Sequence, residues 1–344
     1  MGKIVTFGEI MLRLTPKGYQ RFLQTSSLEA SFGGGEANVA VSLANFGLDA
    51  AFVTKLPTHE IGQAAVNCIR QFGVDTSPIV RGGKRIGIYF LEKGASQRPS
   101  KVIYDRANSS IAEAGPSDFN WNKIFDKESF GASWFHFTGI TPALGDSAAA
   151  ICLEAAKTAK EKGITVSCDL NYRKNLWPKE KAREVMTMLA QYVDICIANE
   201  EDAADVFGIH AKDSDVSSGR ISHDAYREVA QTLAAQFGFK KVAITLRESI
   251  SANDNNWAGM LYDGKDYYFS RKYPIHIVDR VGGGDSFAAG LIYGITGGFP
   301  PQETIEFAVA ASCLKHSIEG DFNLVSVDEV KKLVSGDSSG RVQR

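Results

Sequence analysis

The chain has little of what marks a secreted, membrane-spanning or nucleic-acid-binding protein. Its 344 residues include only five cysteines, and no two of them have the Cys-x-x-Cys spacing of a metal or redox site. No apolar stretch approaches the ~20 residues that span a membrane, and the opening MGKIVTFGEI lacks the apolar segment of a signal peptide. The formal net charge of −2 gives no overall attraction to nucleic acid or to an anionic membrane. We therefore expect a cytoplasmic protein with reduced thiols that binds neither nucleic acid nor a membrane.

Two common catalytic patterns are also missing. The six histidines show no His-x-x-x-His or other metal-ligand spacing. The chain has no Gly-x-Ser-x-Gly nucleophile elbow either. These absences argue against a histidine-based metal centre and against an α/β-hydrolase.

Short apolar, β-branched runs alternate with helix-like segments along most of the chain. KIVTFGE precedes GGGEANVAVSLANFG, and the runs SWFHFTG, ITVSCDLNY and VDICIAN are each followed by a helix-like segment. Apolar strands without strict alternation are typical of a parallel sheet that helices cover on both faces. Between Thr76 and Arg106 the pattern changes to two β-like runs with no helix between them, which indicates a hairpin or small sheet over the mouth of the main sheet.

Three consecutive glycines, Gly282, Gly283 and Gly284, lie between a strand-like run and a helix-like run, and Asp285 follows them. Backbone N–H groups at a helix N-terminus and the helix dipole together favour an anion, and glycine lets a ligand approach the backbone closely. The alternative is a tight turn capped by an aspartate, which is a preferred N-cap residue. Because a cap does not need three glycines, the segment favours an anion-binding loop, and both interpretations stay open at this point.

Further candidates lie at other strand ends. The run Gly33–Gly35 also opens a helix-like segment, so it is either a tight turn or a second approach of backbone to ligand. Arg173 follows a predicted strand, where ligands of parallel α/β sheets bind, and Arg106 is a second cation on the inserted β region. Each arginine alone can equally be a solvated surface charge. The acidic run Asn199–Asp202 either complements a helix dipole or organises a magnesium ion.

Together these segments resemble the ribokinase-like (PfkB-type) sugar kinases over nearly the whole chain. The features that carry the resemblance are a first strand ending in Gly-Glu, Gly34-Gly35-x-x-Asn38, the inserted β region, Asn199-x-x-Asp202 and Gly282-x-Gly284-Asp285. The resemblance implies a three-layer α/β/α sandwich with a mostly parallel central sheet, forming one kinase domain over about residues 1–335. It also implies a β-sheet lid formed mainly by residues 10–32 and 77–107, and a disordered tail over 336–344. ATP and Mg²⁺ are the implied cofactors. The family leaves room for a monovalent cation and for a homo-oligomer.

Within that family the chain is most similar to 2-keto-3-deoxygluconate kinases, through Tyr89, the Tyr104-Asp-Arg106 run, FTGITPAL and CDLNYRKNLW. The resemblance assigns catalysis to Asp285 as base with Gly282, Gly283 and Gly284 as anion hole. It assigns the substrate to Gly34, Gly35, Asn38, Tyr89, Tyr104, Arg106, Arg173 and Asp285, ATP to Asn199, Thr245, Arg247, Gly282 and Gly284, and magnesium to Asp202.

The implied reaction is phosphorylation of 2-keto-3-deoxygluconate to its 6-phosphate. Two arginines suit a keto-acid because the guanidinium fork matches a carboxylate. Arg13 stands where many neutral-sugar kinases have Asp, and an arginine there would not repel an acidic substrate as Asp would. Arg247, Arg280 and Gly283 depart from the usual family residues. The alternatives are a kinase of another sugar, such as fructose or 2-keto-3-deoxygalactonate, and a non-catalytic sugar-acid sensor.

Overall fold

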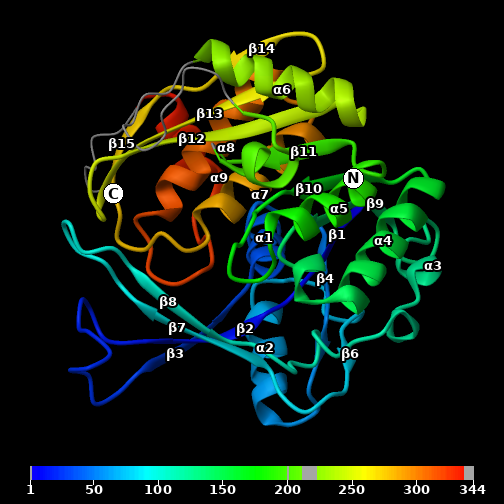
Figure 1. Ribbon diagram of the computed structural model, residues 1–344, viewed down its shortest axis with the longest axis vertical. Coiled ribbons are helices and arrows are strands. Elements are labelled where there is room, and N and C mark those ends of the chain that lie inside the picture. Colours follow the sequence, from blue (N-terminus) through cyan, green and yellow to red (C-terminus); the bar gives the residue numbers. More distant parts are fainter. Residues whose placement is uncertain (1, 200, 211–222, 337–344) are drawn as a thin grey trace.

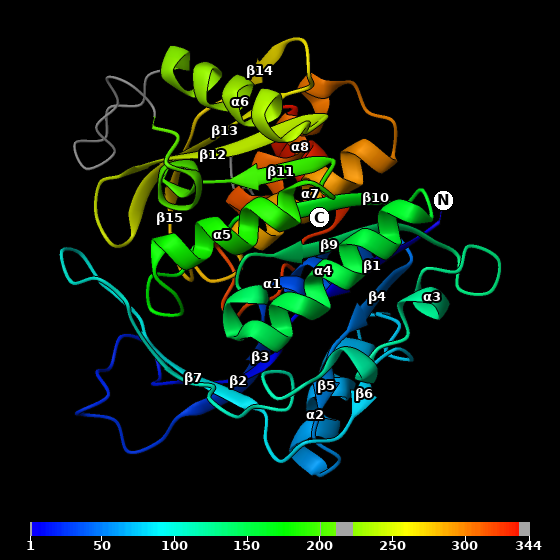
Figure 2. The same ribbon diagram turned by 45° about the vertical axis from the view of Figure 1, so that its right-hand side comes forward.

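The computed structural model describes residues 2–199, 201–210 and 223–336. Over these ranges a mostly parallel central sheet lies between two layers of helices, as Figures 1 and 2 show. Its strands, in spatial order, are β14 (Tyr267–Phe269), β13 (Asp254–Tyr262), β12 (Lys241–Ser249), β11 (Ile195–Ala198), β10 (Thr165–Asp169), β9 (Ala132–Thr138), β1 (Lys3–Phe7) and β4 (Ala50–Val53), with β15 (Tyr273–His276) beside β13. Residues 211–222, in a polar stretch at 210–224 that could be a surface loop, and most of the predicted tail (337–344) lie outside the described residues.

The parallel part of the sheet runs from β4 through β1, β9, β10 and β11 to β12. The remaining strands, β13 to β15, pair antiparallel at one edge. Strands such as β4 and β11 are buried along their whole length, which explains why their sequences are apolar without alternation.

Helices cover both faces of this sheet. One face packs against α1 (Gly35–Asn45), α2 (Glu60–Arg70), α7 (Gly283–Thr296), α8 (Pro301–Lys315) and α9 (Val327–Val334). The other packs against α3 (Trp121–Ile124), α4 (Asp146–Glu161), α5 (Lys179–Ala190) and α6 (His223–Phe237). The expected three-layer α/β/α sandwich is confirmed. Within the described ranges, no helix is both long and apolar enough to cross a membrane.

A smaller sheet projects from one end of this body, at the lower left of Figure 1. Its order is β3 (Glu29–Gly33), β2 (Met11–Thr15), β7 (Gly87–Glu92) and β8 (Lys101–Asp105). Strand β8 is exposed along its whole length, whereas β7 is largely buried. The remaining elements are short: β5 (Lys55–Leu56), β6 (Val80–Arg81), 3₁₀ turns at Pro116–Asp118 and Pro142–Leu144, and a π-helical turn at Ala203–Phe207. The small sheet stands beside the carboxyl ends of the parallel strands, where ligands bind in this class of fold.

Candidate functional site

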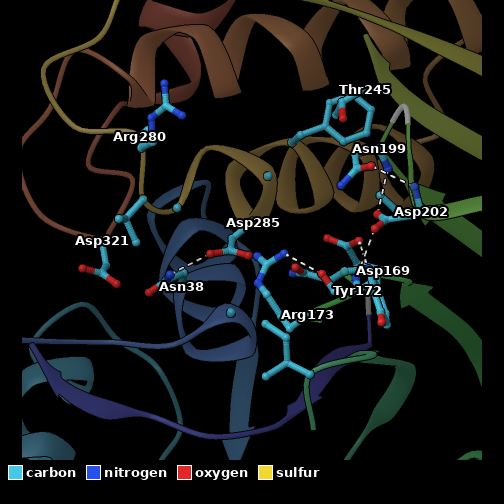
Figure 3. A pocket seen from close by; sticks show the side chains of 18 of the residues that line it. Asn38, Asp169, Tyr172, Arg173, Asn199, Asp202, Thr245, Arg280, Asp285 and Asp321 are labelled. Carbon is cyan, nitrogen blue, oxygen red and sulfur yellow. Dashed lines mark hydrogen bonds between the residues drawn. The ribbon is translucent and has the colours of Figure 1, made fainter. Parts of the chain in front are cut away.

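The main cleft of the described chain lies between the small sheet and the carboxyl ends of the central strands. A cavity of about 550 Å³ reaches from Tyr104 on β8 to Arg247 on β12. A second cavity of about 840 Å³ adjoins it, and Gly34, Tyr104 and Arg173 line both. The two cavities are therefore parts of one site, whose centre Figure 3 shows.

The loop Gly282–Gly284 forms the N-terminus of α7 and faces this cleft. Gly282 has a φ of 83°, which glycine adopts most readily, and a Cβ there would overlap the carbonyl oxygen of Asp321. A Cβ on Gly283 would lie only 2.5 Å from the ring of His316. His316 thus fills the space of a methyl group at this position, which explains why glycine stands where the family usually has alanine. The predicted helix N-terminus is confirmed.

Asn38 on α1 connects the two glycine runs. Its Nδ2 donates a hydrogen bond of 2.7 Å to Asp285 Oδ2, and its Oδ1 accepts one of 3.2 Å from the backbone N–H of Gly34. Figure 3 shows this bond at the centre of the cleft. Asp285 directly follows the run Gly282–Gly284, so the side-chain amide of Asn38 orients the Asp285 carboxylate and links it to the run Gly33–Gly35.

The environment of Asp285 suits a general base. Burial raises the pKa of Asp285 to about 6, while the Asn38 hydrogen bond and the charges of Arg173 and Lys315 oppose the rise. The side chain is densely surrounded by protein yet keeps partial exposure to the cleft. A carboxylate with this pKa is mostly ionised at neutral pH and is a stronger proton acceptor than an ordinary aspartate.

Two more carboxylates lie nearby, at the ends of β10 and β11. Burial, together with the charges of Asp202 and Asp285, raises the pKa of Asp169 well above its ordinary value. The oxygens of Asp202 accept backbone N–H bonds from Tyr172 (3.1 Å) and Asn199 (3.0 Å). Asp169 was not predicted as a site residue, although the sequence places it at the end of a predicted strand.

This donor set fits a magnesium ion carried largely by nucleotide phosphates. Mg²⁺ prefers hard oxygen ligands and keeps several waters, so one or two nearby carboxylates suffice. Asp169 and Asp202 both line the cleft and repel one another, a strain that a divalent cation relieves. Among the described residues, no three acidic, His or Cys side chains form a metal site by themselves. The assignment of magnesium to Asp202 stays a prediction.

The two predicted arginines line the same cavity and differ in their surroundings. Arg173 is exposed, its Nη1 donates 3.1 Å to the carbonyl of Tyr172, and Figure 3 shows it between Asp285 and Asp169. Arg106 is buried and ion-paired with Glu9, its Nε lying 2.8 Å from Glu9 Oε2. Tyr104 lies beside Arg106, 5.3 Å from guanidinium carbon to ring centre.

Arg13 does not reach the cleft. Its guanidinium lies outside both cavities, is 2% exposed, and forms ion pairs with Asp279 (2.5 Å) and Asp321 (2.8 Å). Although burial opposes the charged form, the two carboxylates hold the pKa of Arg13 above its ordinary value. Arg13 therefore acts as a buried counter-ion and not as a substrate contact. Tyr89 joins the same cluster, since its hydroxyl donates to Asp321 at 2.6–2.7 Å.

The far end of the cleft carries the predicted nucleotide residues. Thr245, Arg247 and Asn199 all line it. Arg280 lines it as well, and its Nη2 donates 3.1 Å to the carbonyl of Ala252. Burial and then the charge of Arg247 lower the pKa of Arg280, so the two cations lie near one another. Two cations beside a glycine loop form a surface suited to phosphate.

Every predicted catalytic, substrate, ATP or metal residue lines one of the two cavities, except Gly283, which lies behind the loop surface. Residues missed from the sequence are Asp169, Arg280 and the supporting side chains Glu9, His316 and Asp321. Glu9 and Arg280 belong to segments that the sequence did single out. His316 and Asp321 lie in no recognisable motif, so only the fold reveals them.

Comparisons with known proteins agree with this geometry. A family model described as pfkB family carbohydrate kinase matches residues 1–323. A curated 2-dehydro-3-deoxygalactonokinase of Haloferax volcanii is 32% identical over 340 residues, which cover 98% of each chain. A 2-dehydro-3-deoxygluconokinase of Thermoproteus tenax is 26% identical, covering 93% of this chain and 90% of its own.

Solved structures give the same result. The crystal structure of 2-dehydro-3-deoxygluconokinase from Thermotoga maritima is 55% identical, with a TM-score of 0.93, and the match covers 98% of this chain and 100% of that one. A putative 2-keto-3-deoxygluconate kinase from Enterococcus faecalis is 29% identical with a TM-score of 0.91, covering 100% and 99%. The chain therefore belongs to the pfkB family of carbohydrate kinases.

Proposed function

We propose that this kinase phosphorylates the C6 hydroxyl of 2-keto-3-deoxygluconate (2-dehydro-3-deoxygluconate) with ATP. The observation that carries the proposal is the arrangement of charge along the cleft. Arg106 and Arg173 lie at one end, where a carboxylate can bind, and Asp285 lies between them and the glycine loop. A neutral hexose does not need two cations. The name of the Thermotoga maritima relative, at 55% identity, supports the same substrate.

Asp285 accepts the proton of the attacking hydroxyl, and Asn38 holds the carboxylate in place for that transfer. The backbone N–H groups of Gly282–Gly284 stabilise the charge that develops on the phosphoryl oxygens. Asp202 and Asp169 would lie near a Mg²⁺ ion carried by the phosphates, which would supply further neutralisation of charge. Thr245, Arg247 and Asn199 hold the nucleotide at the far end of the cleft. Positioning dominates because phosphoryl transfer requires little covalent participation by the protein.

The small sheet serves as a lid in this proposal. It carries Tyr89, Tyr104 and Arg106, so closing it over the sugar acid brings the substrate contacts into place and excludes water. Glu9 already holds Arg106 toward the cleft through two of the guanidinium nitrogens. Since Nη1 has no part in those two bonds, it remains well placed to receive the substrate's carboxylate.

The second candidate substrate is the C4 epimer, 2-keto-3-deoxygalactonate. It is favoured by the name of the Haloferax volcanii relative, which is 32% identical. The sensor interpretation is set aside because the chain belongs to a kinase family.

An ATP-consumption assay across ketodeoxygluconate, ketodeoxygalactonate, fructose and ribose tests the proposal. We expect the highest kcat/KM with ketodeoxygluconate and a phosphate on C6 of the product, which ³¹P and ¹³C NMR identify. A clear preference for a neutral sugar contradicts the carboxylate interpretation. A preference for ketodeoxygalactonate keeps the site and changes only the epimer.

We also propose that the enzyme is a homo-oligomer, through the exposed edge strand β8 of the small sheet. Val102, Ile103 and Tyr104 are 38%, 45% and 41% exposed on the edge strand β8. An uncovered apolar strand invites a partner. Light scattering coupled to size-exclusion chromatography tests this, and a monomer at micromolar concentration contradicts it.

A further inference from the structure

The end of helix α8 lies directly behind the glycine loop and holds it in three ways. Ser312 Oγ donates 2.7 Å to the carbonyl of Gly283, and the ring of His316 packs against the same residue. Lys315 is fully buried, and its Cε lies 3.2 Å from where a Cβ on Gly282 would stand. The lysine stem therefore runs against the back of the predicted anion hole.

The Lys315 ammonium is placed among carboxylates. It donates 3.1 Å to the carbonyl of Ile318. Burial lowers the pKa of Lys315, and the charges of Asp279, Asp321 and Asp285 act against that fall. A buried ammonium is costly unless it is compensated, so these carboxylates account for its place in the core.

Lys315 offsets the excess negative charge of the ion-paired cluster behind the loop. Asp279 and Asp321 contribute two negative charges, and Arg13, which is ion-paired with both, contributes one positive charge. Lys315 brings the cluster to neutrality. Without it, a net negative charge would lie behind a loop that must receive phosphoryl oxygens.

The two carboxylates of this cluster, where a monovalent cation could bind, already accept hydrogen bonds from the protein. Asp279 Oδ2 accepts from Arg13 and from the N–H of Gly320 (3.1 Å), and its Oδ1 accepts from the N–H of Val281 (3.2 Å). Both oxygens of Asp321 accept from Tyr89, and Oδ1 also accepts from Arg13. An added cation would have to displace Arg13 from these carboxylates.

We propose that Lys315 is a positioning residue of the phosphoryl transfer. It supplies a fixed positive charge behind the anion hole, where an added monovalent cation is not needed. It acts through the backbone of Gly282 and touches neither substrate. The inference rests on phosphoryl transfer at Asp285 and not on which sugar acid is the substrate.

The test compares Lys315→Met, which keeps length and removes charge, with Lys331→Met, a control at an exposed lysine on α9. We expect Lys315→Met to lower kcat by roughly 10- to 10³-fold, as losses of transition-state charge stabilisation do. The KM for the sugar acid should change by less than about threefold, since Lys315 does not contact it. The control should match the wild type.

Two readouts separate this role from a purely structural one. Lys315 lowers the pKa of Asp285, so the acid limb of the kcat/KM profile should move to higher pH in Lys315→Met. The other groups that face Asp285 are Asn38, Arg173, Asp169 and Asp321, and the variant leaves them in place. In addition, wild-type turnover should be the same when tetramethylammonium replaces potassium.

Wild-type kcat in a folded Lys315→Met protein overturns the proposal, and so does a wild-type enzyme that requires potassium. The cation experiment needs no variant, so it decides the question even if Lys315→Met fails to fold. Melting temperature and circular dichroism establish folding. Each comparison uses whichever sugar acid the wild type turns over fastest, so an error in the proposed substrate does not affect it.

Discussion

Replacing Asp285 with asparagine tests the centre of the mechanism. The change keeps the size and shape of the side chain but removes the proton acceptor, and the amide of Asn38 stays beside it. General base catalysis by a positioned carboxylate contributes about 10²–10⁴-fold, which corresponds to roughly 2.7–5.5 kcal/mol of activation free energy at 1.36 kcal/mol per decade. We expect kcat to fall by that factor while the KM for ATP barely changes, because ATP binds mainly through other residues.

The pH profile gives an independent measure of the same group. Because the pKa of Asp285 is about 6, its ionised form outnumbers its protonated form by about ten to one at about pH 7. At about pH 5 this ratio is reversed. Because the base must be ionised to act, wild-type kcat/KM should rise through about pH 6 and then level off. The residual activity of Asp285→Asn should lack this acid limb.

A coupled assay of ADP formation between pH 5 and pH 8.5 measures both effects. Asp266→Asn, an exposed aspartate in the β13–β14 turn, is the matched control and should behave as the wild type. Near-normal turnover of Asp285→Asn, or an acid limb that survives the substitution, would refute the base assignment.

Three further substitutions probe the surrounding residues. Arg106→Ala should raise the KM for the sugar acid and weaken its binding by roughly 2–5 kcal/mol, because the charge of Arg106 is buried. The control Arg85→Ala, which removes an arginine paired with Asp105, should not raise it. Equal effects of the two variants in steady-state assays would contradict the carboxylate contact. Arg13→Met breaks two buried ion pairs and should lower the free energy of unfolding by about 3–5 kcal/mol in denaturant titrations. An unchanged midpoint speaks against its counter-ion role. Gly283→Ala should cost about 1–3 kcal/mol through overpacking against His316. Adding His316→Ala should recover part of that stability, and a strictly additive double variant would rule out the contact.

The parts of the site that the sequence revealed depend on local patterns. Glycine runs at predicted helix starts indicated two loops at one end of a parallel sheet, because the carboxyl ends of its strands lie together. The Asn38–Asp285 bond, which spans 247 positions, confirms that the two loops meet. The strand–helix alternation likewise predicted the layers, since both faces of the sheet must be covered.

The buried role of Arg13 could not be predicted from the sequence, for a physical reason. An isolated arginine in a strand gives no indication of its partners, and these stand 266 and 308 positions away in the chain. Only the packing of β2 against the loop ahead of α7 and against the segment between α8 and α9 brings them together. The same holds for Lys315, which in the sequence is one cation at the end of an apolar helix and in the fold lies against Gly282.

Because α8 supports the glycine loop, this enzyme should be sensitive to insertions within α8. Ser312, Lys315 and His316 follow one another at helical spacing, so they share one face of the same rod. Inserting a single residue upstream within α8 would turn that face by about 100° and withdraw all three contacts at once. Every residue of the Gly282–Asp285 motif would be intact, yet the loop would lose the surface on which its shape depends. A chain can therefore carry this motif in full and still be a poor kinase, because the loop's geometry is specified some thirty residues further along the chain.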